Sequence, residues 1–472
     1  MKKYEAIVVG SGPNGLAAAI TLAKAGVSVL VLEAARTPGG GARSEPLTIP
    51  GFIHDVCSAV HPMAVASPFF KSLPLEQFGL EWVHSQAVLA HPLENNEAIL
   101  LHTSVEATAK NLDIDGEAYY DLMQPMSQHW EEIFSETMGP LFHWPKHPMT
   151  LASFGLKAIR SAEIFARMHY HGPRARALFA GMAAHVNTPL DKTGTAAIGL
   201  MLNLAAHAKG WPFPRGGAQK LTDALLAYFR SLGGDLQTHR EIRSMRDLPS
   251  SHWVFLDLTP RQILSIFADS VSHVESYRWN SFSYGPAVFK IDWALSAPIP
   301  WSAKECLKAA TVHVCGDFDE ILLSESAPIK GKLSQRPFVL LTQPSLFDLT
   351  RAPQGQHTAW AYCHVPHDTT VNCTEIIEAQ IERFAPGFKK NILARHILGP
   401  QDLQKRNPNL VGGDIMGGAF SLKQLLFGPS RSMNPYHLSI PGFFICSSST
   451  PPGPGVHGMC GFNAAQNVLR EL

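Results

Sequence analysis

The segment AIVVGSGPNGLAAAITLAKAGVSVLVLE, residues 6–33, largely decides the fold that this chain can adopt. Residues 6–9 form a short apolar and partly β-branched run, which is typical of a buried parallel strand. Gly10, Gly12 and Gly15 then form a G-x-G-x-x-G pattern. The first glycine allows a tight turn, the second leaves room for a pyrophosphate, and the third lets a helix pack close to the strand. The pattern therefore predicts a dinucleotide-binding turn.

A helix from about residue 14 to residue 25 and a second strand over residues 29–32 are expected after this turn. The free N–H groups and the positive dipole end of the helix would face the anion. Glu33 ends the second strand, where its carboxylate can accept both ribose hydroxyls and would repel a 2′-phosphate. Because the context is complete, we interpret the glycines as a dinucleotide site rather than as an ordinary glycine-rich turn.

Composition limits the classes of protein to which the chain can belong. Its 472 residues suffice for two or three domains, and a hydrophobic content of 45% predicts a large core. Lys+Arg and Asp+Glu both total 39, so the formal net charge is zero. A chain without net positive charge does not attract nucleic acid electrostatically, and we expect no nucleic-acid partner. The seven cysteines form no C-x-x-C pair, which predicts neither a metal site nor a redox dithiol.

The sequence predicts no membrane-spanning segment. The first strand begins within a few residues of the N-terminus, so we expect no signal peptide. The longest apolar runs, residues 177–186 and 196–206, are too short to cross a bilayer. We expect a cytoplasmic protein, for which peripheral contact with a membrane surface is still open.

A second glycine-rich stretch, RTPGGGARS at residues 36–44, follows the dinucleotide unit. Three small residues before Arg43 suit a loop wrapped on a phosphate, with the arginine as its charged partner. A flexible surface loop is the alternative, but the position directly after Glu33 favours the ligand. His54, Asp55 and His61 follow near the same crevice, and each could instead be a structural polar group.

The middle of the chain predicts a second domain. Residues from about 70 to 210 indicate a mostly helical substrate or cap domain, with apolar faces that are more often core than ligand tunnel. Its expected helices cover residues 117–138, 149–171 and 173–184. The chain then returns to the parallel sheet, with helices over residues 218–231 and 260–268 and strands over residues 235–238, 241–245 and 253–257.

A strand-rich region and a glycine-rich C-terminus complete the pattern. Strands over residues 287–293, 311–315, 338–342 and 358–364, with helices over residues 317–326 and 374–384, predict a mixed sheet in the second half of the substrate domain. Residues 442–446 predict another buried strand. The last helix begins after small residues near His457, so its start is a candidate anion or ring-edge site.

Taken together, these segments resemble the phytoene desaturase-like flavoproteins, within the broader amine-oxidase-like FAD superfamily. The matching pieces are VVGSGPNGLAAA with Glu33, RTPGGGAR, GFIHDVCSAVHP, FPRGGAQKLTDAL, VGGDIMGGA and SSSTPPGPGVHGMCGFNAA, which span nearly the full length. The resemblance implies an α/β fold, in which a Rossmann-type FAD-binding domain carries an inserted α+β substrate domain. It places the discontinuous FAD domain at residues 1–70, 210–275 and 425–472, and the substrate or cap domain at residues 71–209 and 276–424.

By this resemblance the cofactor is FAD. The residues assigned to it are Gly10, Gly12, Pro13, Asn14, Gly15, Glu33, Ala34, Gly40, Gly41, Ala42, Arg43, Ile242, His457, Gly458 and Met459. Among them, Glu33 would hold the adenosine ribose, Arg43 a phosphate, and Ile242 the adenine through its backbone. The segment from His457 to Met459 would lie at the isoalloxazine, where helix N–H groups can stabilise negative charge.

The resemblance also implies an enzyme, an FAD-dependent oxidoreductase that desaturates an apolar small molecule by hydride transfer to flavin. Oxygen or a quinone would take the electrons, because no nicotinamide domain is evident. In carotenoid desaturases an acid and an arginine have been suggested near the flavin, just before an R-x-x-F segment. Arg176 could match that arginine, but Pro173 stands where the acid would be. His185 and His61 are alternative candidates for proton transfer.

Two other functions stay open at this point. A redox-neutral isomerase would use reduced FAD to polarise a double bond. A protein stabilised by FAD but acting through partner contacts is the other alternative.

Overall fold

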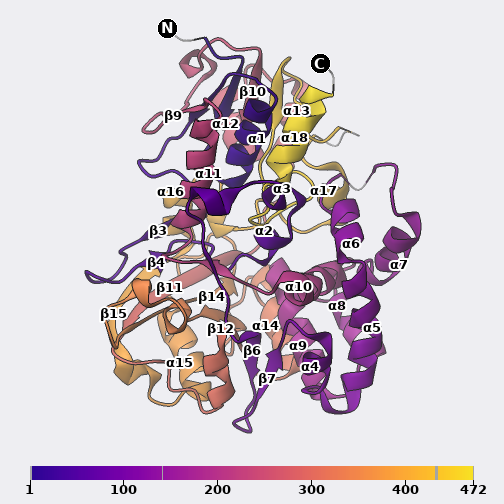
Figure 1. The fold of residues 1–472 in the computed structure, drawn as a ribbon, viewed down its shortest axis with the longest axis vertical. Helices are drawn as coiled ribbons and strands as arrows, with labels where there is room; N and C mark the ends of the chain where they lie inside the picture. The colour runs from indigo at the N-terminus through magenta and orange to yellow at the C-terminus, as the bar shows by residue number, and fades with distance from the viewer. Residues whose placement is uncertain (1–2, 141, 431–433, 471–472) are drawn as a thin grey trace.

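The computed structural model describes residues 3–140, 142–430 and 434–470. Figure 1 shows a parallel sheet with its helices close to both ends of the chain. A mixed sheet lies at the opposite end of the molecule, and a group of helices stands beside it. Each part is assembled from segments that are distant in the sequence.

The parallel sheet gathers strands from the beginning, the middle and the end of the chain. In spatial order its strands are β16 (Phe443–Ile445), β10 (Trp253–Leu256), β1 (Ala6–Val9), β2 (Val29–Leu32) and β9 (Asp235–Gln237), and all neighbours are parallel. Parallel strands bring their carboxyl ends to one edge of the sheet, where ligands of such folds bind. The residues that follow β1, β2 and β10 therefore lie close together.

Both faces of this sheet are buried, as its continuous apolar strands predict. Ala6 and Val8 of β1 point to one hydrophobic cluster, and Ile7 and Val9 point to another on the opposite face. The helices of the first face are α1 (Pro13–Lys24), α11 (Gln219–Ser231) and α18 (Met459–Leu469), and those of the second are α12 (Pro260–Phe267) and α13 (His273–Asn280).

The mixed sheet has a single parallel pairing among its described strands, between β12 and β6. Its spatial order is β15 (Ile392–Leu398), β11 (Ala287–Leu295), β14 (His357–Val365), β13 (Val339–Thr342), β12 (Ala309–Val314), β6 (Ala87–Pro92) and β7 (Ala98–Leu101). Its core includes Trp293, against which the buried side of α15 (Thr374–Phe384) packs through Ile377 and Ile381.

Helices and two short ribbons fill the rest of the described chain. The helices are α2 (Pro62–Ala66), α3 (Pro68–Lys71), α4 (Val105–Ala109), α5 (Gly116–Gln128), α6 (Trp130–Thr137), α7 (Pro148–Ala158), α8 (Ala162–His169), α9 (Pro173–Ala183), α10 (Thr195–Lys209), α14 (Phe318–Ser326), α16 (Pro400–Arg406) and α17 (Leu422–Phe427). The ribbons pair β3 (Ser44–Glu45) with β4 (His54–Asp55), and β5 (Trp82–Val83) with β8 (Phe213–Pro214). In the described ranges, no helix combines the length and the apolar character needed to cross a bilayer.

Several predicted elements need correction. The strand expected over residues 241–245 does not form, because Asp247 Oδ2 accepts the backbone N–H groups of Arg243 and Ser244 that a ladder would use. The helix expected over residues 117–138 divides into α5 and α6 at His129. The helix expected over residues 149–171 divides into α7 and α8, since Ser161 caps a new start.

The region from 70 to 210 is also less purely helical than predicted. The β6–β7 hairpin lies within it and extends the mixed sheet through the pairing with β12. Its strands, AVLAHP and AILL, are short apolar runs with no clear period, so their pairing partner more than 200 residues away decides their structure.

The contact between α1 and α18 depends on a glycine. A Cβ atom at Gly461 would lie 1.8 Å from the carbonyl oxygen of Asn14 in α1. We expect Gly461→Ala to lower the free energy of unfolding by about 2 kcal/mol or more, because backbone on both sides prevents relaxation. Denaturant unfolding measures this change.

Gly155 provides the matched control. It lies inside α7, and no atom lies within 4 Å of the position of its added Cβ. Gly155→Ala should leave the stability unchanged or raise it by about 0.5–1 kcal/mol. Equal effects of the two substitutions would contradict the close packing of α1 on α18.

Candidate functional site

The site begins at the glycine turn between β1 and α1. Gly12 is the N-cap of α1, and Pro13 occupies its first turn, where the missing N–H costs nothing. Gly10 has a φ of 100°, which a residue with a side chain rarely adopts. A Cβ at Gly15 would lie 2.2 Å from the carbonyl oxygen of Gly10. The turn is therefore folded tightly enough to bring the backbone against a phosphate.

The second glycine-rich loop lies on the first, as the sequence predicts for a shared ligand. A Cβ at Gly40 would lie 3.0 Å from the Cα atom of Gly12. Gly41 and Ala42 continue the loop, and their carbonyl oxygens accept hydrogen bonds from Ser58 and Thr222. These bonds fix the loop against the rest of the domain.

Arg43 supplies an uncompensated positive charge at this loop. Only 8% of the residue is exposed, and its Nε donates to the carbonyl oxygen of Gly40 at 2.9 Å. Among the described residues, no carboxylate pairs with it. A buried guanidinium is costly without an anionic partner, so its setting fits a phosphate that comes with a ligand.

Glu33 stands at the carboxyl end of β2, and its carboxylate is held in place by neighbours. Oε2 accepts from the N–H of Ser11 at 2.9 Å and from its hydroxyl at 2.5 Å, and Oε1 accepts from the N–H of Ala35 at 2.8 Å. Ala34 is exposed beside it. An oriented carboxylate at this point suits recognition of ribose hydroxyls.

The segment after β9 passes next to Glu33. His239 and Arg240 donate their N–H groups to the carbonyl oxygens of Ala35 and Glu33. Ile242, which follows, is 5% exposed and belongs to the hydrophobic cluster beneath the sheet. The structure thus brings Ile242 close to the ribose end of the site, even though no strand forms there.

The turn that starts α18 is organised by His457. Its Nδ1 accepts the N–H of Met459 at 3.0 Å, so Nε2 carries the proton and donates to the carbonyl oxygen of Gly453 at 3.1 Å. Burial lowers the pKa of His457 to about 4, and the ring stays neutral. A Cβ at Gly458, where φ is 68°, would lie 2.7 Å from Phe69. The side chain of His457 and the backbone of Gly458 therefore both stabilise this turn.

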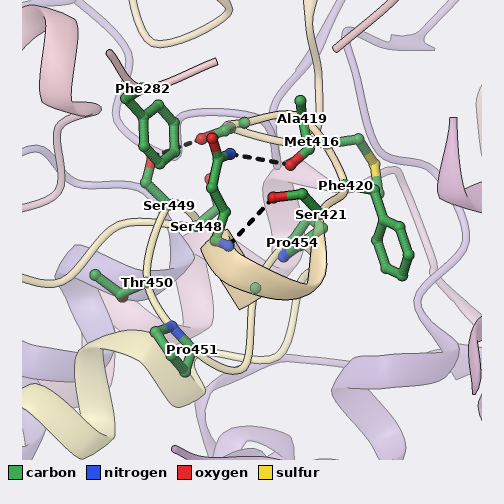
Figure 2. A pocket seen from close by; sticks show the side chains of 14 residues that line it. Phe282, Met416, Ala419, Phe420, Ser421, Ser448, Ser449, Thr450, Pro451 and Pro454 are labelled. Atoms are coloured by element: carbon green, nitrogen blue, oxygen red, sulfur yellow. Dashed lines mark hydrogen bonds between the residues drawn. The ribbon is translucent and has the colours of Figure 1, made fainter. Parts of the chain in front are cut away.

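Two glycine-rich motifs meet beside this turn. Figure 2 shows a pocket lined by the loop before α17 and by the segment from Ser448 to Pro454. Ser449 donates to the carbonyl oxygen of Gly417 at 2.6 Å, and a Cβ at Gly417 would lie 2.3 Å from the hydroxyl oxygen of Ser448. The close fit explains why glycine is required in VGGDIMGGA.

His61 lies next to the phosphate loop. Its Nε2 is 3.2 Å from the hydroxyl of Ser58, which donates to the carbonyl oxygen of Gly41. Burial lowers the pKa of His61 to about 4. The ring is therefore a neutral hydrogen-bonding group at physiological pH, positioned near the predicted cofactor site.

His185 is half-buried and contacts the rings of Trp211 and His313. Its Nε2 is 2.9 Å from Nε2 of His313 on β12, so one ring donates and the other accepts. Burial lowers the pKa of His185 to about 3, and the pKa of His313 is also lowered by burial. A neutral pair of this kind can relay a proton only after gaining one.

Arg176 is in the first turn of α9, where its Nε donates to the carbonyl oxygen of Tyr170 at 2.8 Å. Figure 1 places α9 beside the mixed sheet, away from α1. The three predicted catalytic residues thus occupy different surroundings, and His61 is the one that shares bonds with the phosphate loop. Their catalytic roles stay predictions.

Buried charges at the junction of the two sheets were missed by the sequence reasoning. Lys290 and Asp292 of β11 pair at 2.6 Å, and Lys290 Nζ lies 5.2 Å from the ring centre of Trp360. Burial opposes ionisation of Asp292, but Lys290 and nearby groups hold its pKa below the usual value. The available signal was a lysine and an aspartate two residues apart in an apolar strand, which puts them on one face.

A second buried ion pair joins the same junction. Asp55 Oδ2 accepts from Arg351 at 2.6 Å, and its other oxygen accepts from the hydroxyl of Ser44 and from the N–H of Ala218. Ser44 directly follows the phosphate loop. The pair therefore ties that loop to the segment that precedes β14.

Comparisons with known proteins agree with this geometry. The family described as "NAD(P)-binding Rossmann-like domain" matches residues 8–73. The rat protein named pyridine nucleotide-disulfide oxidoreductase domain-containing protein 2 is 26% identical, over 100% of this chain and 94% of its own. A neurosporene-forming phytoene desaturase of Rhodobacter capsulatus is 22% identical, over 97% of this chain and 92% of its own. The chain is thus similar in sequence to phytoene desaturases over nearly its full length.

The fold has solved counterparts. An oxidoreductase of Methanosarcina mazei superposes with a TM-score of 0.68 at 14% sequence identity, over 98% of this chain and 99% of the other. The chain therefore shares the fold of this structure, an α/β fold that contains the predicted Rossmann-type unit. All seven of its cysteines are free thiols, so the word "disulfide" in the rat relative's name has no counterpart here.

The Asp55–Arg351 pair should be a strong determinant of stability. We expect Arg351→Met to lower the free energy of unfolding by about 3–5 kcal/mol, because it leaves the Asp55 carboxylate buried without its cation. Arg243→Met, which removes the exposed pair with Glu241, is the control and should change the unfolding midpoint little. Chemical denaturation of both variants measures the difference, and a small effect of Arg351→Met would contradict this role.

Proposed function

We propose that the chain binds FAD and dehydrogenates an apolar small molecule. The observation that carries the proposal is Arg43, a buried guanidinium without a carboxylate partner in the described chain, beside two interlocked glycine loops. These features fit the pyrophosphate of a dinucleotide, and Glu33 is oriented for the ribose. The Glu33 carboxylate would repel a 2′-phosphate, which argues against a 2′-phosphorylated dinucleotide. The similarity to phytoene desaturases favours FAD among the dinucleotides that are left.

The chain's own residues would bind, orient and shield the cofactor. Arg43 and the N-terminus of α1 would hold the phosphates, and Glu33 would exchange its bond with Ser11 for ribose hydroxyls. The turn held by His457 would direct the first N–H groups of α18 toward the flavin. When bound, FAD supplies hydride chemistry, and the protein supplies positioning and exclusion of water.

The apolar substrate follows from two kinds of support. The relatives include phytoene desaturases, and the interior between the mixed sheet and the helices is largely apolar. Oxygen or a quinone would then accept the electrons. His61 and His185 are the candidates for proton transfer, and both are neutral in their buried surroundings.

The cofactor part is tested by the absorbance spectrum of the purified protein. We expect bound flavin, and we expect Glu33→Arg to weaken FAD affinity by at least about tenfold, because it removes the ribose acceptors. Glu33→Gln should have a smaller effect, since it keeps one acceptor oxygen. A colourless protein that takes up no FAD, with no effect of Glu33→Arg, would contradict the proposal.

The reaction is tested by anaerobic titration with candidate unsaturated or aliphatic lipids. Bleaching of the flavin supports dehydrogenation. An isomerised product without bleaching would instead support the redox-neutral isomerase, and an inert flavin with a stable co-purifying partner would support a partner-binding role.

The proposal includes peripheral contact with a membrane through α7. Trp144 is 92% exposed, and Met149, Leu156 and Ile159 form an exposed apolar stripe at helical spacing. Residues 142–160 contain no acidic residue but contain Lys146, Lys157 and Arg160. An apolar stripe flanked by positive charge suits an anionic lipid surface, from which an apolar substrate could enter.

Vesicle co-sedimentation tests this surface. We expect binding to vesicles that contain phosphatidylserine, weaker binding to phosphatidylcholine alone, and a loss of about tenfold or more for the double variant Trp144→Ser, Leu156→Ser. Leu349→Ser is the control, because Leu349 is 83% exposed outside this stripe. Equal binding of both variants would contradict the assignment.

A further inference from the structure

The glycine turn has an acidic neighbour that its motif does not include. Asp257 directly follows β10, and its N–H donates to the carbonyl oxygen of Val9 at 2.9 Å. One carboxyl oxygen, Oδ2, accepts the N–H of Gly15 at 3.0 Å. Asp257 thus bonds to a backbone group at the start of α1, where the motif predicts the pyrophosphate.

The side chain of Asp257 lies against all three glycines of the motif. A Cβ at Gly12 would lie 2.7 Å from Asp257 Oδ2, and added Cβ atoms at Gly10 and Gly15 would lie 3.1 Å and 3.2 Å from Asp257 Cβ. The glycines therefore make room for this carboxyl group as well as for a ligand. Within the described chain, no cation forms an ion pair with Asp257.

Apart from the N–H of Gly15 at the start of α1, the groups around Asp257 do not favour a negative charge. Glu33 faces it from the end of β2, and a carboxylate there adds to the cost of ionisation. Cys446 faces it from the end of β16 and Cys460 from α18; burial raises the pKa of both thiols, that of Cys460 to about 12, so both are neutral. Burial raises the pKa of Asp257 to about 7, and the Gly15 N–H offsets this only in part.

We propose that Asp257 contacts the pyrophosphate of the bound dinucleotide as a neutral acid, so that FAD binding takes up one proton. This inference rests on the proposed function. Two anions in contact at this half-buried position would repel each other, whereas a carboxylic acid can donate a hydrogen bond to a phosphate oxygen.

In this proposal, binding changes the protonation of the Asp257 carboxyl group. The carboxylate takes one proton from solvent, Oδ2 keeps the bond from Gly15, and the other oxygen donates its O–H to the phosphate. The phosphate charge raises the pKa of Asp257 further in the complex. Affinity is therefore greatest at pH values below the pKa of the free protein, and it falls as the pH rises through and above that value.

Isothermal titration of the full chain with FAD, between about pH 6 and about pH 9, tests this. For the unmodified chain we expect affinity to fall about tenfold per pH unit on the alkaline side, with uptake of about one proton at about pH 8. Repeating the titration in buffers of different ionisation enthalpy measures that proton directly, without any variant.

Asp257→Asn reproduces the shape and the donor of the neutral acid. Its affinity should be independent of pH, and at about pH 8 it should bind FAD about tenfold more tightly than the unmodified chain, without proton uptake. Asp115→Asn is the matched control, because Asp115 is a buried aspartate that also accepts backbone N–H groups, but in the helical part of the chain. It should keep the unmodified pH dependence.

Other results would contradict either the role of Asp257 or the binding of FAD. A pH-independent affinity of the unmodified chain, or equal pH dependence in Asp257→Asn, would overturn the role of Asp257 while leaving FAD binding intact. Loss of proton uptake in Glu33→Gln but not in Asp257→Asn would assign the proton to Glu33 and overturn the inference. A chain that is folded by circular dichroism but binds no FAD at any of these pH values would contradict the proposed function itself.

Discussion

The structure depends on the close approach of backbone segments around the first turn of α1. Gly10 and Gly15 meet within the turn, Gly40 lies on Gly12, and Gly461 brings α18 against the carbonyl group of Asn14. At each contact, a side chain in place of the glycine would collide with the neighbouring backbone. The N-terminal and C-terminal segments therefore form one unit, although more than 400 residues separate them.

Two ionisable side chains of this unit form no internal ion pair within the described chain. Arg43 is buried without a carboxylate partner in the described chain, and Asp257 has no paired cation there either. Elsewhere in the interior, Asp55 with Arg351 and Lys290 with Asp292 show the usual pairing. This contrast distinguishes ion pairs that stabilise the fold from the unpaired groups, Arg43 and Asp257, to which we assign a role in binding.

Sequence reasoning succeeded where the information is local. The spacing of Gly10, Gly12, Gly15 and Glu33 fixes a strand–helix–strand unit within 28 residues, and the fold class follows from it. It failed for the β6–β7 hairpin, where a distant strand decides the pairing. It also failed at residues 241–245, where the side chain of Asp247 binds the backbone N–H groups that a strand would use. The position of Asp257 was equally hidden, since its contacts are with Val9 and with the glycines that follow β1.

The strand order of the parallel sheet also constrains how the chain can fold. β1 pairs with β10, and β10 with β16, so the sheet is incomplete until residues near 445 have left the ribosome. Such long-range pairing closes large loops, and the entropy of loop closure is lost before the stabilising strand contacts form. Folding is therefore slow. During synthesis the edge of β10 is unpaired and an apolar face of the sheet is exposed. The risk of aggregation is therefore greatest in this period. The FAD that we propose as the cofactor would therefore bind only after the chain is complete.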